Sequence, residues 1–121
     1  MNDLESQLAA KIAIIKQEFL VRLRDDWLPN LQRLRQGFLT TPTDKALLTE
    51  LMRAAHDMTG SGSVFGCDDI SNVGRSLEQR LRTMIASDTA ANEVDHREIL
   101  ALTDRLQEVC AVALRDAEPH T

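Results

Sequence analysis

Apolar residues recur every three or four positions along almost the whole chain, which is the spacing of one face of a helix. In the first third of the chain this face consists of Leu4, Leu8, Ile12, Ile15, Phe19, Leu23, Trp27, Leu31, Leu34 and Phe38. Pro29 falls inside the pattern, and because proline lacks a backbone N–H we expect a kink or a break between Asp25 and Leu28. Gly37 and the segment Thr40–Thr43 are expected to end this helical region.

The same spacing predicts two helices in the middle of the chain. Thr43 or Asp44 is the expected N-cap of the first, and Gly66 its C-terminal cap. Asp68 or Asp69 is the expected N-cap of the second. The positions predicted to face inward are Leu47, Leu48, Leu51, Ala55 and Met58 in the first helix, and Ile70, Val73, Leu77, Leu81 and Met84 in the second.

A last helix is predicted after the polar stretch 87–91. Asn92, with Asp95 three residues later, resembles a capping box, and residues 117–121 are expected to fray. The inner face of this helix is predicted to contain Ile99, Leu102, Leu106, Val109 and Ala113. Because nothing alternates with a period of two, we predict an all-α protein: an antiparallel four-helix bundle with an additional N-terminal helix, in one domain spanning residues 1–121.

Composition and charge narrow the classes of partner. With 14 Lys and Arg against 19 Asp and Glu, the formal charge is -5, which disfavours binding to nucleic acid or anionic lipid. The N-terminus lacks the basic and apolar regions of a signal peptide, and no segment approaches the length of a membrane span. We therefore expect a soluble cytoplasmic protein with neither a nucleic-acid nor a membrane partner. Cys67 and Cys110 are expected to be reduced and partly buried, although the sequence leaves a disulfide between them open.

The stretch 55–66, AHDMTGSGSVFG, contains the residues with the most evident chemistry. Its glycines read GxGxxxG, one residue longer than the dinucleotide-binding fingerprint, and they follow a predicted helix instead of a strand. A metal site built on His56 and Asp57 would need further ligands, and the other histidines of the sequence are only His96 and His120. We therefore predict neither a phosphate-binding loop nor a metal centre.

The remaining interpretation is a helix that presents a reactive histidine. With Leu47 at 0° and about 100° per residue, the apolar positions centre near roughly 60° and His56 falls near roughly 180°, on the solvent side. Gly60, one turn later, costs a helix about 1 kcal/mol relative to Ala, and its missing side chain would let another protein approach the imidazole. The surface neighbours of His56 are predicted to be Thr49, Met52, Arg53, Thr59, Gly60 and Ser63.

These residues resemble the pattern of the histidine phosphotransfer (HPt) domain family, which is His-x-Leu-Lys-Gly-Ser/Ala, then an apolar residue and Gly, then Leu-Glu a helix later. The matching residues are His56, Gly60-Ser61, Phe65-Gly66 and Leu77-Glu78. The resemblance covers most of the chain, because the segment 19–34 also fits the helix that precedes the phosphorylated one. It implies a helical bundle in which Nε2 of His56 accepts a phosphoryl group from a receiver-domain phosphoaspartate and returns it to another receiver.

The family resemblance also implies which partner proteins the chain has and which of them supplies the metal ion. The partners would be response-regulator receiver domains or a hybrid histidine kinase, and the receiver would supply Mg²⁺, so the chain would need no cofactor of its own. An imidazole with an ordinary pKa of about 6.5 is largely neutral near pH 7 and is a nucleophile without a further base. The chain would be a phosphoryl carrier without an ATP-binding or hydrolytic site, and not an enzyme. Its cognate partners, and whether the N-terminal helix serves folding, dimerisation or partner choice, stay open.

Thr59 departs from the family pattern, because it stands where the family usually has Lys. That lysine is thought to help neutralise the phosphoryl group, so we hypothesise that Arg53, one turn before His56, supplies a cation instead. Met52, Thr59, Gly60 and Ser63 are the further candidates for contact with phosphate or partner, whereas the charged residues 75–82, including Glu78, are interpreted as a solvated face with intrahelix pairs. The alternative function is a helical docking module that binds and regulates a receiver or another signalling partner without transferring phosphate.

Overall fold

The computed structural model describes residues 3–87 and 93–117, and the elements within these ranges are all helical. The order along the chain is α1 (Asp3–Arg22), a π-helical segment η1 (Leu23–Trp27), α2 (Leu28–Thr40), α3 (Lys45–Val64), α4 (Asp68–Ala86) and α5 (Glu93–Asp116). The predicted all-α fold class is therefore confirmed for the described part of the chain.

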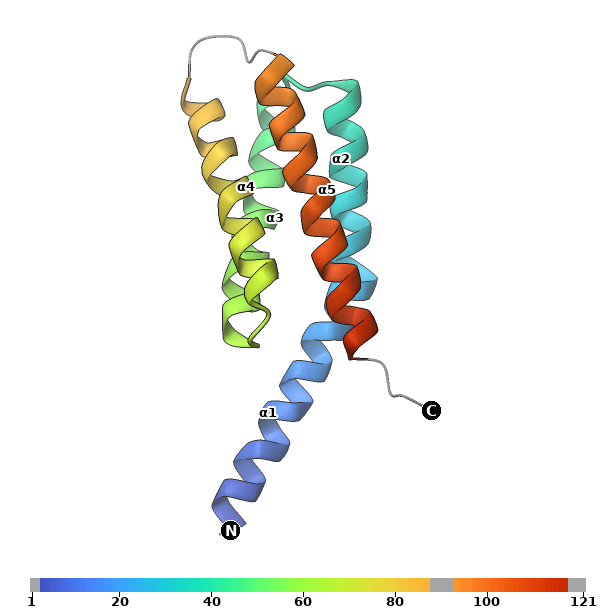
Figure 1. Ribbon diagram of the computed structural model, residues 1–121, viewed down its shortest axis with the longest axis vertical. Helices are drawn as coiled ribbons and strands as arrows, with labels where there is room; N and C mark the ends of the chain where they lie inside the picture. Colours follow the sequence, from blue (N-terminus) through green and yellow to red (C-terminus); the bar gives the residue numbers. More distant parts are fainter. Residues whose placement is uncertain (1–2, 88–92, 118–121) are drawn as a thin grey trace.

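Four helices lie side by side, and α1 extends away from one end of this group (Figure 1). Each of α2, α3, α4 and α5 packs against two of the other three, and consecutive helices run in opposite directions (Figure 1). The packing of α3 against α4 is the most extensive in the molecule. The histidine motif on α3 therefore lies on the helix pair with the largest shared contact.

Pro29 marks the place where the first helical region changes character. The chain continues from α1 into α2 without a break, but residues Leu23–Trp27 form a π-helical turn in which the N–H of Leu28 donates to the carbonyl of Leu23. The wider turn accommodates a proline ring that would otherwise crowd the carbonyl four residues earlier. The expected disturbance between Asp25 and Leu28 is thus present, in the form of a π segment.

The turns around α3 follow directly from their residues. Asp44 is the N-cap of α3, and its Oδ1 accepts hydrogen bonds from the N–H groups of Ala46 (3.0 Å) and Leu47 (3.5 Å). Gly66 follows the end of α3 with a φ of 73°, in the left-handed region that favours glycine, while the N–H of Cys67 donates to Gly62 at 2.8 Å. The predicted caps Asp44 and Gly66 are confirmed.

One further prediction about a helix end is wrong, and another is correct only in part. The N-cap position of α4 is occupied by Cys67, and both Asp68 and Asp69 lie in the first turn, where their charge still complements the positive helix end. Helix α2 ends at Thr40, at the start of the predicted segment Thr40–Thr43, but Gly37 itself does not end it. Its missing side chain serves packing instead, because a Cβ at Gly37 would lie 2.9 Å from a methyl group of Leu47 on α3.

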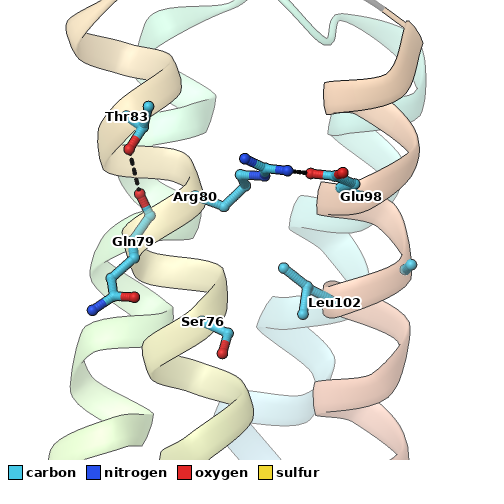
Figure 2. A pocket seen from close by; sticks show the side chains of 7 residues that line it. Ser76, Gln79, Arg80, Thr83, Glu98 and Leu102 are labelled. Carbon is cyan, nitrogen blue, oxygen red and sulfur yellow. Dashed lines mark hydrogen bonds and ion pairs between the residues drawn. The ribbon is translucent and has the colours of Figure 1, made fainter.

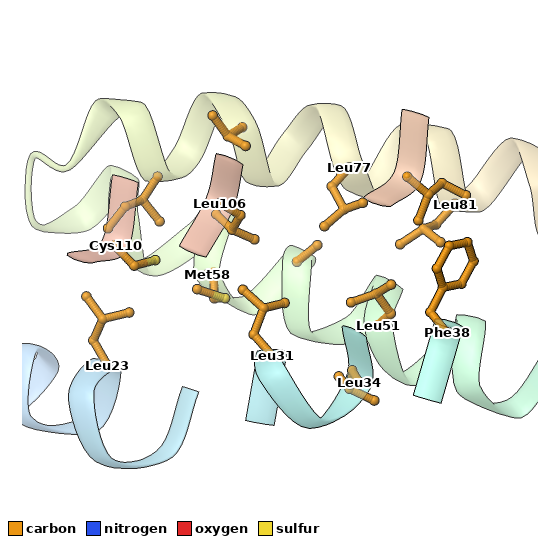
Figure 3. Packing of buried hydrophobic residues seen from close by; sticks show 14 of the residues in the cluster. Leu23, Leu31, Leu34, Phe38, Leu51, Met58, Leu77, Leu81, Leu106 and Cys110 are labelled. Atoms are coloured by element: carbon orange, nitrogen blue, oxygen red, sulfur yellow. The ribbon is translucent and has the colours of Figure 1, made fainter. Parts of the chain in front are cut away.

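The hydrophobic core lies between α2, α3, α4 and α5 (Figure 3). Leu51, Ala55, Leu77, Leu81 and Leu106 are fully buried, and Leu23 of η1 joins them at the end near α1. Several residues predicted to face inward are only half-buried at the margin of this core, namely Leu47, Met84, Leu102, Val109 and Ala113. The predicted inner faces of α3, α4 and α5 do pack into the core, but each buried face is narrower than predicted.

Both cysteines are free: Cys110 is buried and Cys67 is half-buried, as expected for reduced thiols. Burial raises the pKa of the Cys67 thiol and raises that of Cys110 to about 12. None of the described helices has the length and apolar character that crossing a membrane requires. The predicted cap at Asn92 and the last four residues of the predicted frayed end lie outside the described residues.

Candidate functional site

His56 lies in the middle of α3 on the surface of the helix bundle. Its side chain is 68% exposed, whereas Ala55 and Met58 on the opposite side of the helix are buried. The helical-wheel prediction that His56 lies on the solvent side is therefore confirmed. An exposed imidazole is accessible to a large partner without any rearrangement of the bundle.

A carboxylate from the neighbouring helix contacts this imidazole. Oε1 of Glu78 on α4 lies 2.9 Å from Nδ1 of His56. The Glu78 side chain is only 12% exposed, and the same oxygen accepts a hydrogen bond of 2.7 Å from Nη2 of Arg82, one turn further along α4. Glu78 is thus held between a cation on its own helix and the histidine on α3.

This contact determines which ring nitrogen of His56 is free. An ionised carboxylate only accepts hydrogen bonds, so in the neutral imidazole this contact favours the tautomer that carries its proton on Nδ1 and its lone pair on Nε2. Within the described residues, His56 makes no other hydrogen bond or ion pair. In that tautomer the exposed ring has its lone pair on Nε2, which is what nucleophilic attack by an imidazole needs.

The helix pair is packed closely beneath this site because α4 has a glycine there. A Cβ added at Gly74 would overlap the hydroxyl of Thr59 and lie 3.1 Å from the carbonyl oxygen of Ala55. Thr59 is half-buried in this contact, and its hydroxyl donates to the Ala55 carbonyl at 2.7 Å. The Thr59 hydroxyl therefore lies in the helix interface, and Glu78, one turn beyond Gly74, is brought within reach of His56.

Ser63 belongs to a second polar contact between the same helices. Its hydroxyl lies 3.0 Å from that of Ser71 on α4, and the buried Ser71 hydroxyl donates to the carbonyl of Thr59 at 2.6 Å. A Cβ at Gly62 would lie 2.8 Å from the Ser71 hydroxyl, so this glycine too is needed for close approach. The serine pair fixes how α3 and α4 lie relative to each other one to two turns from His56.

The other predicted contact residues are distributed around His56. Gly60 is exposed, and a Cβ there would have nothing within 4 Å, so the surface beside the imidazole is open. Met52 is half-buried against the edge of the core. Arg53 is exposed and lines a hollow with Trp27 and Asp57, on the flank of α3 that faces α2.

Sequence reasoning did not assign a site role to Glu78 or Arg82. The sequence predicts that Glu78 is part of a solvated charged face, but its side chain is only 12% exposed and contacts His56. The predicted intrahelix pairing is nevertheless correct, since Glu78 and Arg82 form an (i, i+4) ion pair. The signal that could have identified Glu78 was its place in the Leu77-Glu78 part of the family pattern.

The described surface also has hollows away from His56, and one of them lies beside α4. Figure 2 shows a hollow on the other flank of α4, between α4 and α5, where the side chains of Arg80 and Glu98 form an ion pair across its mouth. The rest of it is lined by Ser76, Gln79, Thr83, Ala101 and Leu102. Across residues 3–87 and 93–117, no group of three or more His, Cys, Asp or Glu side chains is arranged to hold a metal ion.

Comparison with known proteins gives one match. The family model described as Hpt domain matches residues 15–112, which is most of the chain and includes His56, Glu78 and all of α2, α3 and α4. Neither the curated proteins nor the solved structures contain a match to this sequence.

Proposed function

The chain belongs to the Hpt domain family, and from this premise we propose that it is a phosphorelay carrier that holds a phosphoryl group on His56. The donors and acceptors are receiver-domain aspartates, with a hybrid histidine kinase as a further source of phosphate. The observation that carries the proposal is the contact of 2.9 Å between Nδ1 of the exposed His56 side chain and Glu78, which in the neutral imidazole favours the tautomer with its lone pair on Nε2.

The proposed transfer uses one nucleophile and one leaving group. The Nε2 lone pair attacks the phosphorus of the phosphoaspartate, an N–P bond forms, and the P–O bond to the receiver carboxylate breaks. The imidazole ring becomes positively charged because Nδ1 keeps its proton, and the Glu78 carboxylate stabilises that charge through the hydrogen bond. The reverse attack by a second receiver aspartate restores the neutral imidazole.

The bundle of α2, α3, α4 and α5 is proposed as the unit that presents His56, with α1 as the additional N-terminal helix and residues 1–121 as one domain. Within it, Gly60 admits the receiver surface, while Met52, Thr59 and Ser63 remain candidates for contact with phosphate or partner. The Thr59 hydroxyl would have to leave the Ala55 carbonyl to reach a phosphoryl group. Its present bond favours a packing role over a phosphate contact.

Two arginines are proposed to replace the cation that the family lysine supplies. Arg82 is bonded to Glu78, whose carboxylate also contacts the imidazole, and its side chain is 67% exposed. Arg53 is exposed one turn before His56 on the α2 side. Guanidinium forms charge-assisted hydrogen bonds with phosphate, so either arginine is chemically suited to this role.

A docking module without phosphate transfer is the second candidate, and the position of Thr59 favours it. In such a module the surface around His56 and Gly60 would bind a receiver and regulate it by occupancy. The proposed cytoplasmic location and receiver partners are the same for both functions. The two candidates differ in whether His56 is chemically modified.

The deciding experiment mixes the purified chain with receiver domains that carry phosphoaspartate and follows intact mass. The carrier function predicts one added phosphoryl group that acid removes, and its loss in His56→Gln. His120→Gln is the control, because it removes a histidine outside the proposed site. If receivers bind the chain but no phosphoryl group is added, the docking module is the function.

A further inference from the structure

The hollow that Arg53 lines, here called the Trp27 hollow, lies close to His56 on the flank of α3 that faces α2. Trp27 of η1 and the α3 residues Ala54 and Met58 contribute its apolar lining. Its volume is about 210 Å³, which is below the ~300–1,000 Å³ of a typical small-molecule site. The size of the hollow therefore suits one side chain of a partner better than a cofactor.

Trp27 is held in place by its neighbours within the chain. The ring of Phe19 meets it edge-on at a centroid distance of 5.9 Å, and the guanidinium carbon of Arg22 lies 5.2 Å from its ring centroid. Trp27 is the last residue of the π-helical segment η1, and such segments are rare and frequent at functional sites. A half-buried tryptophan that is already positioned loses little further freedom when a partner packs against it, which makes it a good anchor.

Two charges at the rim of the hollow have no partner within the chain. Arg53 and Asp57 are exposed, and across residues 3–87 and 93–117 neither forms a hydrogen bond or an ion pair. The rim residues Asn30 and Glu50, in contrast, accept hydrogen bonds of 2.8 and 3.1 Å from Arg33. An apolar centre surrounded by polar groups that are free to pair is the usual composition of a protein interface.

The position of the hollow connects it to the partner of His56. Asp57 follows His56 in the sequence, and the open position Gly60 is a helical neighbour of both, three residues after Asp57 and four after His56. Such neighbours lie about 5–6 Å apart, whereas an interface of ~800 Å² per partner covers a disc of about 16 Å radius. A receiver that approaches His56 over Gly60 therefore also covers the hollow.

We propose that the Trp27 hollow anchors the receiver domain by accepting one large apolar side chain from the receiver surface, while Arg53 and Asp57 face polar groups around that side chain. This inference rests on the proposed function, because that function makes a receiver the partner of His56. It also provides a means of discrimination: a receiver without an apolar side chain at the matching position leaves the hollow empty and binds more weakly.

The first test fills the hollow from within the chain. Ala54→Leu occupies the space that the receiver side chain needs, so it should raise the receiver Kd about tenfold or more, the loss typical of an interface anchor. Ala111→Leu is the matched control, because Ala111 is exposed on α5 whereas α3 packs against α2 and α4, and it should bind as the wild type does. Calorimetric titration with unphosphorylated receiver domains measures both affinities, and urea denaturation establishes that each variant folds. Equal affinity of Ala54→Leu and the wild type, or no receiver binding by the wild type, would overturn the proposal.

Trp27 gives a second readout, because it is the only tryptophan of the chain. Saturation with a receiver that contains no tryptophan should shift its emission to shorter wavelength, since docking removes water from the indole. Unchanged emission at saturation would overturn the proposal, and so would a shift on concentrating the chain alone, which would assign the hollow to a second copy. Both tests measure binding and not transfer, so a chain that binds receivers through the hollow without gaining a phosphoryl group would refute the carrier function and support the anchor.

Discussion

Nδ1 of His56 and Oε1 of Glu78 lie 2.9 Å apart, joining α3 to α4 through residues that are 22 positions apart in sequence. In the proposed transfer, the carboxylate favours one imidazole tautomer and would stabilise the charge that a phosphorylated ring carries. Replacing Glu78 with Ala should therefore slow phosphoryl acceptance about tenfold or more, the loss expected for one hydrogen bond to a charged group. Single-turnover transfer from a phosphorylated receiver measures this rate.

A spectroscopic readout separates this role of Glu78 from a general loss of structure. The imidazole ¹⁵N resonances of His56 should show a protonated Nδ1 in the wild-type chain and a mixture of tautomers in Glu78→Ala. Glu78→Gln, which keeps an acceptor oxygen, should recover part of the rate. Glu108→Ala, an exposed glutamate of α5, is the control. Wild-type transfer by Glu78→Ala with an unchanged tautomer would show that Glu78 has no part in the chemistry.

The two arginines near His56 predict an effect of charge on the transfer rate. Arg53→Ala and Arg82→Ala should each slow transfer by about two- to fivefold, because exposed charges contribute at most about 1 kcal/mol. The double variant should be slower than either, and Arg82→Lys should keep more activity than Arg82→Ala. Arg115→Ala at the end of α5 serves as the control. If Arg53→Ala transfers at the wild-type rate, Arg53 does not replace the family lysine.

Gly60 is predicted to be a site where stability and function conflict. Its position is open, so Gly60→Ala should raise the free energy of unfolding by about 1 kcal/mol, the helix-propensity difference. Gly60→Leu should also fold normally but should weaken receiver binding, because its side chain fills the space beside His56. Urea denaturation and a receiver-binding titration measure the two effects. Unchanged receiver affinity in Gly60→Leu would mean that the partner does not approach at this glycine.

Substitution of Gly74 by Ala is predicted to lower stability, whereas the same substitution at Gly60 raises it. A Cβ there would overlap the Thr59 hydroxyl, so Gly74→Ala should lower the free energy of unfolding by about 1–3 kcal/mol, as overpacking does. Combining it with Thr59→Ala should recover part of this loss, although the Ala55 carbonyl at 3.1 Å remains close. Urea denaturation of the single and double variants tests this. A Gly74→Ala variant as stable as the wild type would show that α3 and α4 separate without cost.

The features that the sequence predicted well are those set within one helix. The cap at Asp44, the turn at Gly66 and the exposure of His56 all depend on neighbours a few positions away, where helical geometry decides the outcome. Contacts between helices were not predictable in the same way. The spacing on α4 shows that Glu78 is close to Arg82, but its contact with His56 depends on how closely α3 and α4 pack, and Gly74 has no room for a side chain in that packing.

Burial of Cys110 predicts a particular loss of stability at alkaline pH. The pKa of its thiol is raised from 9.0 to about 12, chiefly because burial disfavours the thiolate, with a further contribution from Cys67. In the unfolded chain the thiol ionises from about pH 9, whereas the folded chain keeps it protonated, so rising pH favours unfolding.

The matched variant for this effect is Cys110→Ala, which is less stable than the wild type at neutral pH because it leaves a cavity. The wild type alone carries the ionisation term, so the stability difference between the two should shrink by about 1 kcal/mol between pH 8 and pH 10. Urea denaturation at each pH measures it, and other titrating groups cancel in the comparison. A difference that stays constant across this range would mean that the Cys110 thiol ionises equally in the folded and unfolded chain, against its burial in the core.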